Sequence, residues 1–321
     1  MAFNAIRGQD HAVGVLRRSL AANRVAHAYL FEGTDGCGKT LAAFSLVESL
    51  FCDSPEPCGS CPACRKMANR QHPDLHLLEP EKGVIKIDRI REIQKELSLR
   101  PVEASKKACI VSQADRMNQN AANAFLKTLE EPPGSAVIIL LSDTPTALLP
   151  TILSRCQRLR FNPLPLDIVV EILTTQGLPA EQAHSAASLA GGSMEKALAI
   201  SQEGFLTRRK EIIEQVIGLS PRDFGILTAT AERLGHEREQ AQEVVEVLTL
   251  FFRDVMLCRH SSGPLVNADL HVVVERTAAA LSPRGIMERL DAVTRAGQSL
   301  LRNVNPRLTL EALFLTLAVD K

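Results

Sequence analysis

The chain has 321 residues, enough for two or three domains that each bury a core. Its 37 Lys and Arg residues balance 37 Asp and Glu residues, so no overall field draws it to nucleic acid or to an anionic membrane. The absence of Trp and the single Tyr argue against a surface of aromatic platforms for stacked bases.

The N-terminal sequence and the apolar runs bear on the compartment. Residues 1–20 lack the apolar core and cleavage site of a signal peptide, and no apolar run approaches the roughly 18 residues of a membrane span. We therefore expect a soluble cytoplasmic protein with no membrane partner. In that reducing compartment, free thiols or metal ligands are the expected states of the cysteines, in preference to disulfides.

The first half alternates short apolar runs with helical stretches, which predicts a parallel sheet with helices on both faces. Ile90, Ile93 and Leu97 repeat at helical spacing, with Asp88 placed to cap that helix. Asn118 likewise precedes a helix that must stop before a Pro-Pro pair. The expected strands are 28–31, 75–78, 109–111, 137–141 and 158–161.

Two prolines in the sequence "FNPLPLD" predict a domain boundary, beyond which the chain is helical almost to its end. We expect an α/β domain over 1–163, a small helical domain over 164–204 and a second helical domain over 205–321. The amphipathic segments 243–258 and 307–318 are expected to pack in the core of that last domain or to hold subunits together.

A phosphate-binding loop follows the first expected strand, and a helix follows the loop. The sequence GTDGCGKT fits G-x-x-x-x-G-K-[ST], in which Gly33, Gly36 and Gly38 let backbone amides turn around a triphosphate. Lys39 should reach the β and γ phosphates, and the Thr40 hydroxyl should ligate magnesium. The alternative is a loop that keeps its shape and holds no nucleotide.

Four cysteines, Cys52, Cys58, Cys61 and Cys64, have the spacing C-x5-C-x2-C-x2-C. Four thiolates close a tetrahedral site that leaves no room for a reactive water, so the pattern predicts structural zinc. A redox pair and an iron–sulfur cluster are the alternatives. His72 is near enough in sequence to replace a ligand, although a surface position is the expectation for it.

The strand expected at 109–111 lacks the acidic residues that an ATP-hydrolysing site of this kind needs. Ser112 and Gln113 follow it, and neither side chain holds magnesium by charge or acts as a base for water. Asp115 lies three residues past the magnesium position, so we do not assign it that role.

Several motifs resemble one family. The sequences NAANAFLKTLEEPP and PTILSRCQRLRF are the most specific, and IRGQDHAVGVLRRSL, the cysteine insert and NVNPRLTLEALFLTLA agree with them. The chain resembles the delta-prime subunits of the bacterial DNA polymerase III clamp loader, within the AAA+ ATPases. The resemblance implies a P-loop AAA+ module, a small helical lid and an all-α collar that holds a ring of subunits together.

The resemblance also implies a role in DNA replication, in which the ring places a sliding clamp on primed DNA. Arg155 matches the arginine finger that one subunit offers to the ATP of its neighbour, with Ser154 and Cys156 positioning it. Glu195 stands where the family's lid helix carries an Arg, and it would repel a γ-phosphate. With Ser112 in place of an acid, the expected protein binds ATP or ADP, with or without magnesium, and does not hydrolyse ATP efficiently.

The expected partners are tau/gamma-like motor subunits and the delta subunit, with indirect or weak contact to the sliding clamp and to primed DNA within the nucleoid-associated replisome. Two alternatives remain. The chain is a tau/gamma-like ATPase that has recruited another acid, or it binds DNA directly through small basic patches. Those patches are Arg65, Lys66 and Arg70 beside the cysteines and the run 208–210, for which solvated surface charge is the simpler reading.

Overall fold

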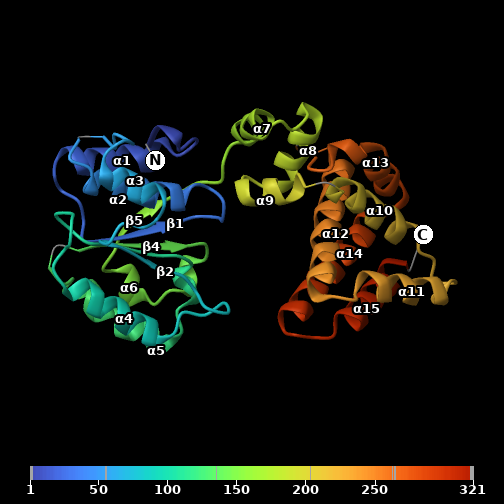
Figure 1. The fold of residues 1–321 in the computed structure, drawn as a ribbon. Coiled ribbons are helices and arrows are strands. Elements are labelled where there is room, and N and C mark those ends of the chain that lie inside the picture. The colour runs from blue at the N-terminus through green and yellow to red at the C-terminus, as the bar shows by residue number, and fades with distance from the viewer. Residues whose placement is uncertain are drawn as a thin grey trace. The chain divides into compact units, whose positions relative to one another are not determined.

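A computed structural model describes residues 3–54, 56–134, 136–202, 204–261, 263 and 265–318. The chain divides into two compact units (Figure 1). The first unit is Met1–Val169 with Gly191–Glu195, and the second is Val170–Ala190 with Lys196–Lys321. The segment Gly191–Glu195 therefore packs with the first unit, although helical residues of the second unit flank it in the sequence.

A five-stranded sheet organises the first unit, and its neighbouring strands are all parallel, in the order β2-β3-β4-β1-β5. The strands are β1 (Ala28–Glu32), β2 (Leu75–Leu78), β3 (Ala108–Val111), β4 (Val137–Ser142) and β5 (Gln157–Arg160). The five strands expected from the sequence are confirmed to within one residue at each end. Because β4 pairs with β1, the segments that leave these two strands meet at one edge of the sheet.

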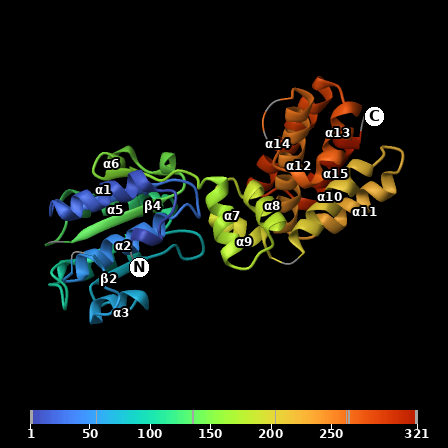
Figure 2. The ribbon, with the colours of Figure 1, turned by 90° about the horizontal axis from the view of Figure 1, so that it is seen from above.

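Helices cover both faces of this sheet (Figures 1 and 2). On one face, Leu16 of α1 and Leu46 of α2 pack with Tyr29 and Phe31 of β1. On the other face, Ile90 of α4 and Phe125 of α5 lie in a second buried core. The helices of this unit are η1 (Phe3–Ala5), α1 (Asp10–Ala21), α2 (Lys39–Phe51), α3 (Pro62–Ala68), α4 (Ile87–Ser98), η2 (Ala114–Arg116), α5 (Gln119–Glu130), η3 (Pro145–Ala147) and α6 (Pro150–Leu153).

The two helix starts expected from the sequence differ in outcome. Asn118 is the N-cap of α5, and its side-chain oxygen accepts a hydrogen bond from the Ala121 amide at 2.8 Å. The expectation for Asp88 is wrong, because α4 begins at Ile87 and Lys86 occupies the cap position. Asp88 lies in the first turn of α4, where a carboxylate still favours the positive end of the helix.

The chain beyond β5 is helical, as expected. Leu248, Phe251 and Val255 of α12 join Phe314 of α15 and Ile286 of α14 in one buried core. The helices are α7 (Leu166–Thr175), α8 (Ala180–Ala190), α9 (Met194–Ile200), α10 (Phe205–Gly218), α11 (Phe224–Leu234), α12 (Arg238–Arg259), η4 (Ala268–Leu270), α13 (His271–Ala280), α14 (Pro283–Leu301) and α15 (Pro306–Ala318). Among the described residues, no helix has the length and apolar character needed to cross a membrane.

Candidate functional site

The expected phosphate loop connects β1 to α2. The Gly33 amide donates a hydrogen bond to the Ser142 carbonyl at the end of β4, which fixes the start of the loop (3.2 Å). Gly38 is the N-cap of α2 with φ of 103°, a conformation that favours glycine. Lys39 and Thr40 are the first residues of α2, and Thr40 is exposed. The loop thus stands before a helix N-terminus, where backbone amides favour phosphate.

The Lys39 side chain lies inside the loop, only 5% exposed. Its ammonium group donates hydrogen bonds to the Gly33 and Thr34 carbonyls, both at 2.7 Å. It also forms an ion pair of 2.7 Å with Oδ1 of Asp143, the residue that follows β4. The sequence reasoning did not identify Asp143, which lies two residues after an expected strand (137–141); its place beside the loop follows from the pairing of β4 with β1, which was not predicted.

The ends of β3 and β4 are joined by Asp115. Its carboxylate accepts hydrogen bonds from the Ser142 hydroxyl at 2.8 Å and from the Asp143 amide at 3.3 Å. Ser112 and Gln113 follow β3, and Gln113 has a left-handed backbone with φ of 48° at the start of η2. Asp115 therefore supports the backbone at the end of β4.

The segment Gly191–Glu195 lies against the tip of the loop. The Met194 amide donates a hydrogen bond to the Gly36 carbonyl at 3.1 Å. A Cβ on Gly36 would lie 2.6 Å from the Glu195 amide nitrogen, so glycine is required for this approach. Hydrogen bonding to the neighbouring Asp35 carboxyl, and repulsion by it, raise the pKa of Glu195.

Gln9, which was not singled out in the sequence, links this loop to the chain that leaves β5. Its side-chain amide donates hydrogen bonds to the carbonyls of Cys37 (3.0 Å) and Asn162 (2.6 Å). Its side-chain oxygen accepts a hydrogen bond from the Asn162 amide at 3.1 Å. Because Gln9 is 4% exposed, these bonds are shielded from water and hold the loop in one position.

Arg155 lies in the turn between α6 and β5. Its guanidinium pairs with the Glu130 carboxylate at 2.5 Å and donates a hydrogen bond to the Thr151 carbonyl at 2.9 Å. A longer hydrogen bond of 3.3 Å reaches the Ser154 hydroxyl. The Arg155 and Glu130 side chains are 33% and 49% exposed, so the guanidinium is ordered and still accessible.

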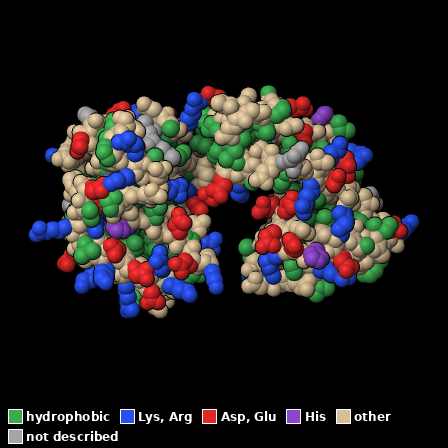
Figure 3. Space-filling model, in the orientation of Figure 1, with side chains coloured by type: hydrophobic (Ala, Val, Ile, Leu, Met, Phe, Trp, Pro, Cys, Tyr) green, Lys and Arg blue, Asp and Glu red, His purple; other side chains and the backbone are tan. Residues whose placement is uncertain are grey.

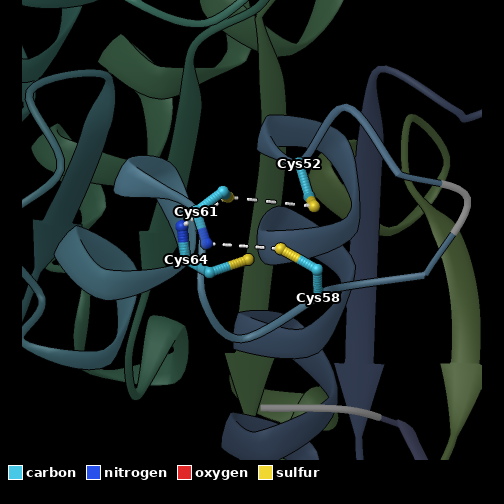
Figure 4. Close-up of side chains that lie close together, drawn as sticks. All are labelled: Cys52, Cys58, Cys61 and Cys64. Atoms are coloured by element: carbon cyan, nitrogen blue, oxygen red, sulfur yellow. Dashed lines mark hydrogen bonds between the residues drawn. The ribbon is translucent and has the colours of Figure 1, made fainter.

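The four cysteines predicted as metal ligands come together (Figure 4). Their sulfur atoms lie within 4.8 Å of one another, which is close to the roughly 3.8 Å separation implied by zinc–sulfur bonds of about 2.3 Å in a tetrahedral site. The Cys61 amide donates to Cys58 Sγ at 3.3 Å, and the Cys64 amide donates to Cys61 Sγ at 3.4 Å. These amides stabilise thiolates, and hydrogen bonds from Ser60 and Cys61 lower the pKa of Cys58 to about 6. The cluster could hold a metal ion.

His72 does not lie on the surface, so that expectation is wrong. Its ring is 3% exposed and stacks on Phe51 with ring centroids 4.3 Å apart. The ring nitrogen Nδ1 accepts a hydrogen bond from the Asp74 amide at 3.2 Å. The ring therefore serves as packing beneath the cysteine module. The cysteines outside the cluster are buried or partly buried; they are Cys37, Cys109, Cys156 and Cys258.

The basic patches considered for DNA binding are largely neutralised by acidic neighbours. Lys66 pairs with Glu103 at 2.5 Å. Arg209 is 1% exposed and pairs with Asp269 and with the Asn267 side chain, so it cannot act as a surface contact. Acidic and basic side chains are intermixed on the visible face of each unit (Figure 3).

The chain matches two family models and several known proteins along its length. The family described as "DNA polymerase III, delta subunit" matches residues 8–165, and "DNA polymerase III, delta subunit, C terminal" matches residues 203–318. The chain is 33% identical over 315 residues to DNA polymerase III subunit delta' of Bacillus subtilis (strain 168), with 96% of each chain covered. It is 30% identical over 291 residues to subunit delta' of Escherichia coli (strain K12), covering 88% of this chain and 85% of the relative.

Two further similarities are more distant. DNA polymerase III subunit tau of Bacillus subtilis (strain 168) is 28% identical over 339 residues, which cover 96% of this chain and 60% of tau. A crystal structure of a DNA polymerase III gamma subunit-related protein from Thermotoga maritima superposes with a TM-score of 0.54 at 24% identity, covering 95% of this chain and 98% of that one. The second similarity supports the fold.

The parallel sheet, its phosphate loop and the helical part that follows give the chain the fold expected for a P-loop AAA+ module followed by helical domains. The chain belongs to the delta' family of DNA polymerase III subunits. It is a delta'-like clamp-loader subunit of DNA replication, as its motifs predicted.

Proposed function

We propose that this subunit does not hydrolyse ATP itself and that it supplies Arg155 to the ATP of a neighbouring motor subunit. The observation that carries the proposal is the accessible guanidinium of Arg155, held in a defined direction by Glu130 and the Thr151 carbonyl. Ser112 and Gln113 support the first half, because the site beside Lys39 lacks the usual acids at the end of β3.

Breaking the Arg155–Glu130 ion pair costs less free energy than Arg155 can contribute at a neighbour's phosphates. An ion pair as exposed as Arg155–Glu130 is worth about 0–1 kcal/mol, so breaking it costs little. An arginine finger accelerates phosphoryl transfer by about 10³-fold or more, which corresponds to about 4 kcal/mol of transition-state stabilisation. Glu130 therefore orients the Arg155 guanidinium through a weak ion pair, which the phosphates of the neighbour's nucleotide can replace.

The proposal includes the assembly and its bound groups. The subunit works with tau/gamma-like motor subunits and a delta subunit, and it reaches the clamp and primed DNA through the assembled complex in the cytoplasm. Its residues 1–163, 164–204 and 205–321 act as AAA+ module, lid and collar. Cys52, Cys58, Cys61 and Cys64 hold one structural zinc ion, which a closed set of four thiolates favours over a catalytic role.

The experiment that tests this function uses the reconstituted clamp loader with clamp and primed DNA. Arg155→Ala should lower ATP hydrolysis at the site it serves by about 10³-fold and slow clamp loading, whereas the exposed Arg160→Ala is the matched control and should change neither. The wild-type chain alone should show no turnover above Lys39→Ala. An Arg155→Ala complex of full activity, or Lys39-dependent turnover by the chain alone, would overturn the proposal.

A further inference from the structure

The phosphate loop of this chain is occupied by the protein's own groups at both ends. At the base, the Lys39 ammonium group donates hydrogen bonds to the Gly33 and Thr34 carbonyls and forms an ion pair with Asp143, all at 2.7 Å. At the tip, the Gly36 carbonyl accepts the Met194 amide at 3.1 Å. The cation that should meet the β and γ phosphates is thus already neutralised by a carboxylate.

Asp143 is placed there by the sheet and by its neighbours. It follows β4, which pairs with β1 and brings the Asp143 backbone beside the loop. Asp115 accepts a hydrogen bond from the Asp143 amide at 3.3 Å and one from the Ser142 hydroxyl at 2.8 Å, so the backbone that carries Asp143 is fixed. A carboxylate presented by a fixed backbone loses little entropy in forming the ion pair, which strengthens it as a competitor.

Two further carboxylates, those of Asp35 and Glu195, lie at the loop. Asp35 lies in the loop itself and accepts a hydrogen bond from the Gly36 amide at 2.8 Å. Glu195 lies close enough to Asp35 for their repulsion to matter, and Asp143 acts on it in the same direction. Lys39 pairs with Asp143 and also attracts the Glu195 carboxylate, so these acidic side chains share its charge. Phosphates that enter this loop must displace one carboxylate and then face two more.

We infer that Asp143 acts as an internal competitor for phosphate, so that this subunit binds nucleoside di- and triphosphates weakly unless the Lys39–Asp143 pair is opened. The glycines of the loop then serve the protein's own contacts, since a side chain at Gly36 would collide with the Glu195 backbone. This inference concerns nucleotide binding by the single chain, and it does not depend on the role proposed for Arg155.

Equilibrium binding of ADP and ATP, each with and without magnesium, to the purified full chain tests the inference by isothermal titration calorimetry. Asp143→Asn keeps the shape and removes the charge, and we expect it to tighten nucleotide binding about tenfold, or about 1.4 kcal/mol. Asp88→Asn, which removes an exposed carboxylate on α4, should leave the affinity unchanged. Adding Lys39→Ala to Asp143→Asn should abolish the gain, because the gain acts through the freed ammonium.

The inference fails if Asp143→Asn, folded by circular dichroism, binds nucleotide no tighter than the wild type. Weaker binding by the variant would also overturn it, since Asp143 would then assist the ligand, for example by holding magnesium. Asp143→Ser provides a second substitution should the Asn variant fold poorly, and the same tightening is expected. The assay contains no partner subunit, so its failure leaves the Arg155 proposal intact, and the loss of that proposal leaves this result intact.

Discussion

Asp74 is a fully buried carboxylate that fixes the segment leading into β3, and its replacement by Asn should destabilise the first unit by about 2–4 kcal/mol. Its Oδ1 accepts a hydrogen bond from the Val102 amide at 2.7 Å, and its Oδ2 accepts from the Glu103 and Ala104 amides, both at 2.8 Å. In Asp74→Asn the better orientation puts the NH₂ group at the Oδ1 position, where it faces the Val102 amide.

The magnitude follows from those three hydrogen bonds. The Val102 amide loses its acceptor, and an unsatisfied buried donor costs about 1–3 kcal/mol. The other two bonds remain but pass from a charged to a neutral acceptor, which removes about half the strength of each. Because the backbone carbonyl of Asp74 still accepts the Ala108 amide at 2.9 Å, β3 keeps its pairing with β2 and the loss stays local.

Urea unfolding followed by far-ultraviolet circular dichroism measures the effect, since a chain without Trp offers no strong fluorescence signal. The control is Asp88→Asn, whose exposed carboxylate should matter by less than about 0.5 kcal/mol. Amide exchange at Val102, Glu103 and Ala104 should also accelerate in Asp74→Asn. A loss below about 0.5 kcal/mol for Asp74→Asn, with unchanged exchange at those amides, would refute the reasoning.

The same carboxylate predicts the sign of a pH dependence. Burial alone would raise the pKa of Asp74, but the amides of Ala104, Glu103 and Val102 outweigh it and hold the pKa below its ordinary 3.8. The stabilisation is therefore complete above the ordinary pKa and is lost as the pH falls towards the lowered one. The difference in unfolding free energy between wild type and Asp74→Asn should shrink below about pH 4, and a difference that grew there would contradict this assignment.

Three further predictions concern the four-cysteine cluster, the tip of the phosphate loop at Gly36 and the ion pair between Arg209 and Asp269. The purified chain should carry one zinc ion when assayed by atomic emission; Cys61→Ser should lose that ion and have a lower melting temperature, whereas Cys258→Ser, outside the cluster, should do neither. Gly36→Ala should destabilise the first unit by about 1–3 kcal/mol, through its left-handed backbone and its collision with the Glu195 amide, measured by urea unfolding. Arg209→Ala should destabilise the second unit by about 1–3 kcal/mol in urea unfolding, because the buried Asn267 side chain loses its donor and the partly exposed Asp269 carboxylate loses its ion pair; a loss below about 0.5 kcal/mol would contradict this.

The central strands β1, β3 and β4 could be predicted because each is a short apolar run between turn residues, and such runs fit a strand that is buried on both faces of a parallel sheet. The four-cysteine cluster was equally accessible, since its ligands lie within 13 residues of one another and their spacing fixes the geometry. Asn118 acted locally as well, through a hydrogen bond to an amide three residues on. Features set by neighbours in sequence were therefore predictable.

The missed residues depend on contacts between distant segments. Gln9 bonds to Asn162 across 153 positions, and Glu130 meets Arg155 only because α5 and α6 pack on the same face of the sheet. The sequence predicted a surface position for His72 because no pattern in the neighbouring residues indicates that its ring stacks on Phe51. Such pairs need the strand order before they can be derived, and the strand order was not predicted.

The Lys39–Asp143 pair and the lost acids at the end of β3 have a common physical consequence. An ATPase needs the lysine of its phosphate loop free to contact the γ-phosphate, and it needs a carboxylate placed to hold magnesium. The lysine and the magnesium ion together then neutralise the charge of the phosphates. Here the positions after β3 carry Ser112 and Gln113, and the Asp143 carboxylate that pairs with Lys39 offsets its charge. Restoring acids at Ser112 and Gln113 alone should therefore not produce a motor, because the added negative charge would meet a loop whose cation is still paired. Removing Asp143 in the same variant is the further step that hydrolysis would require.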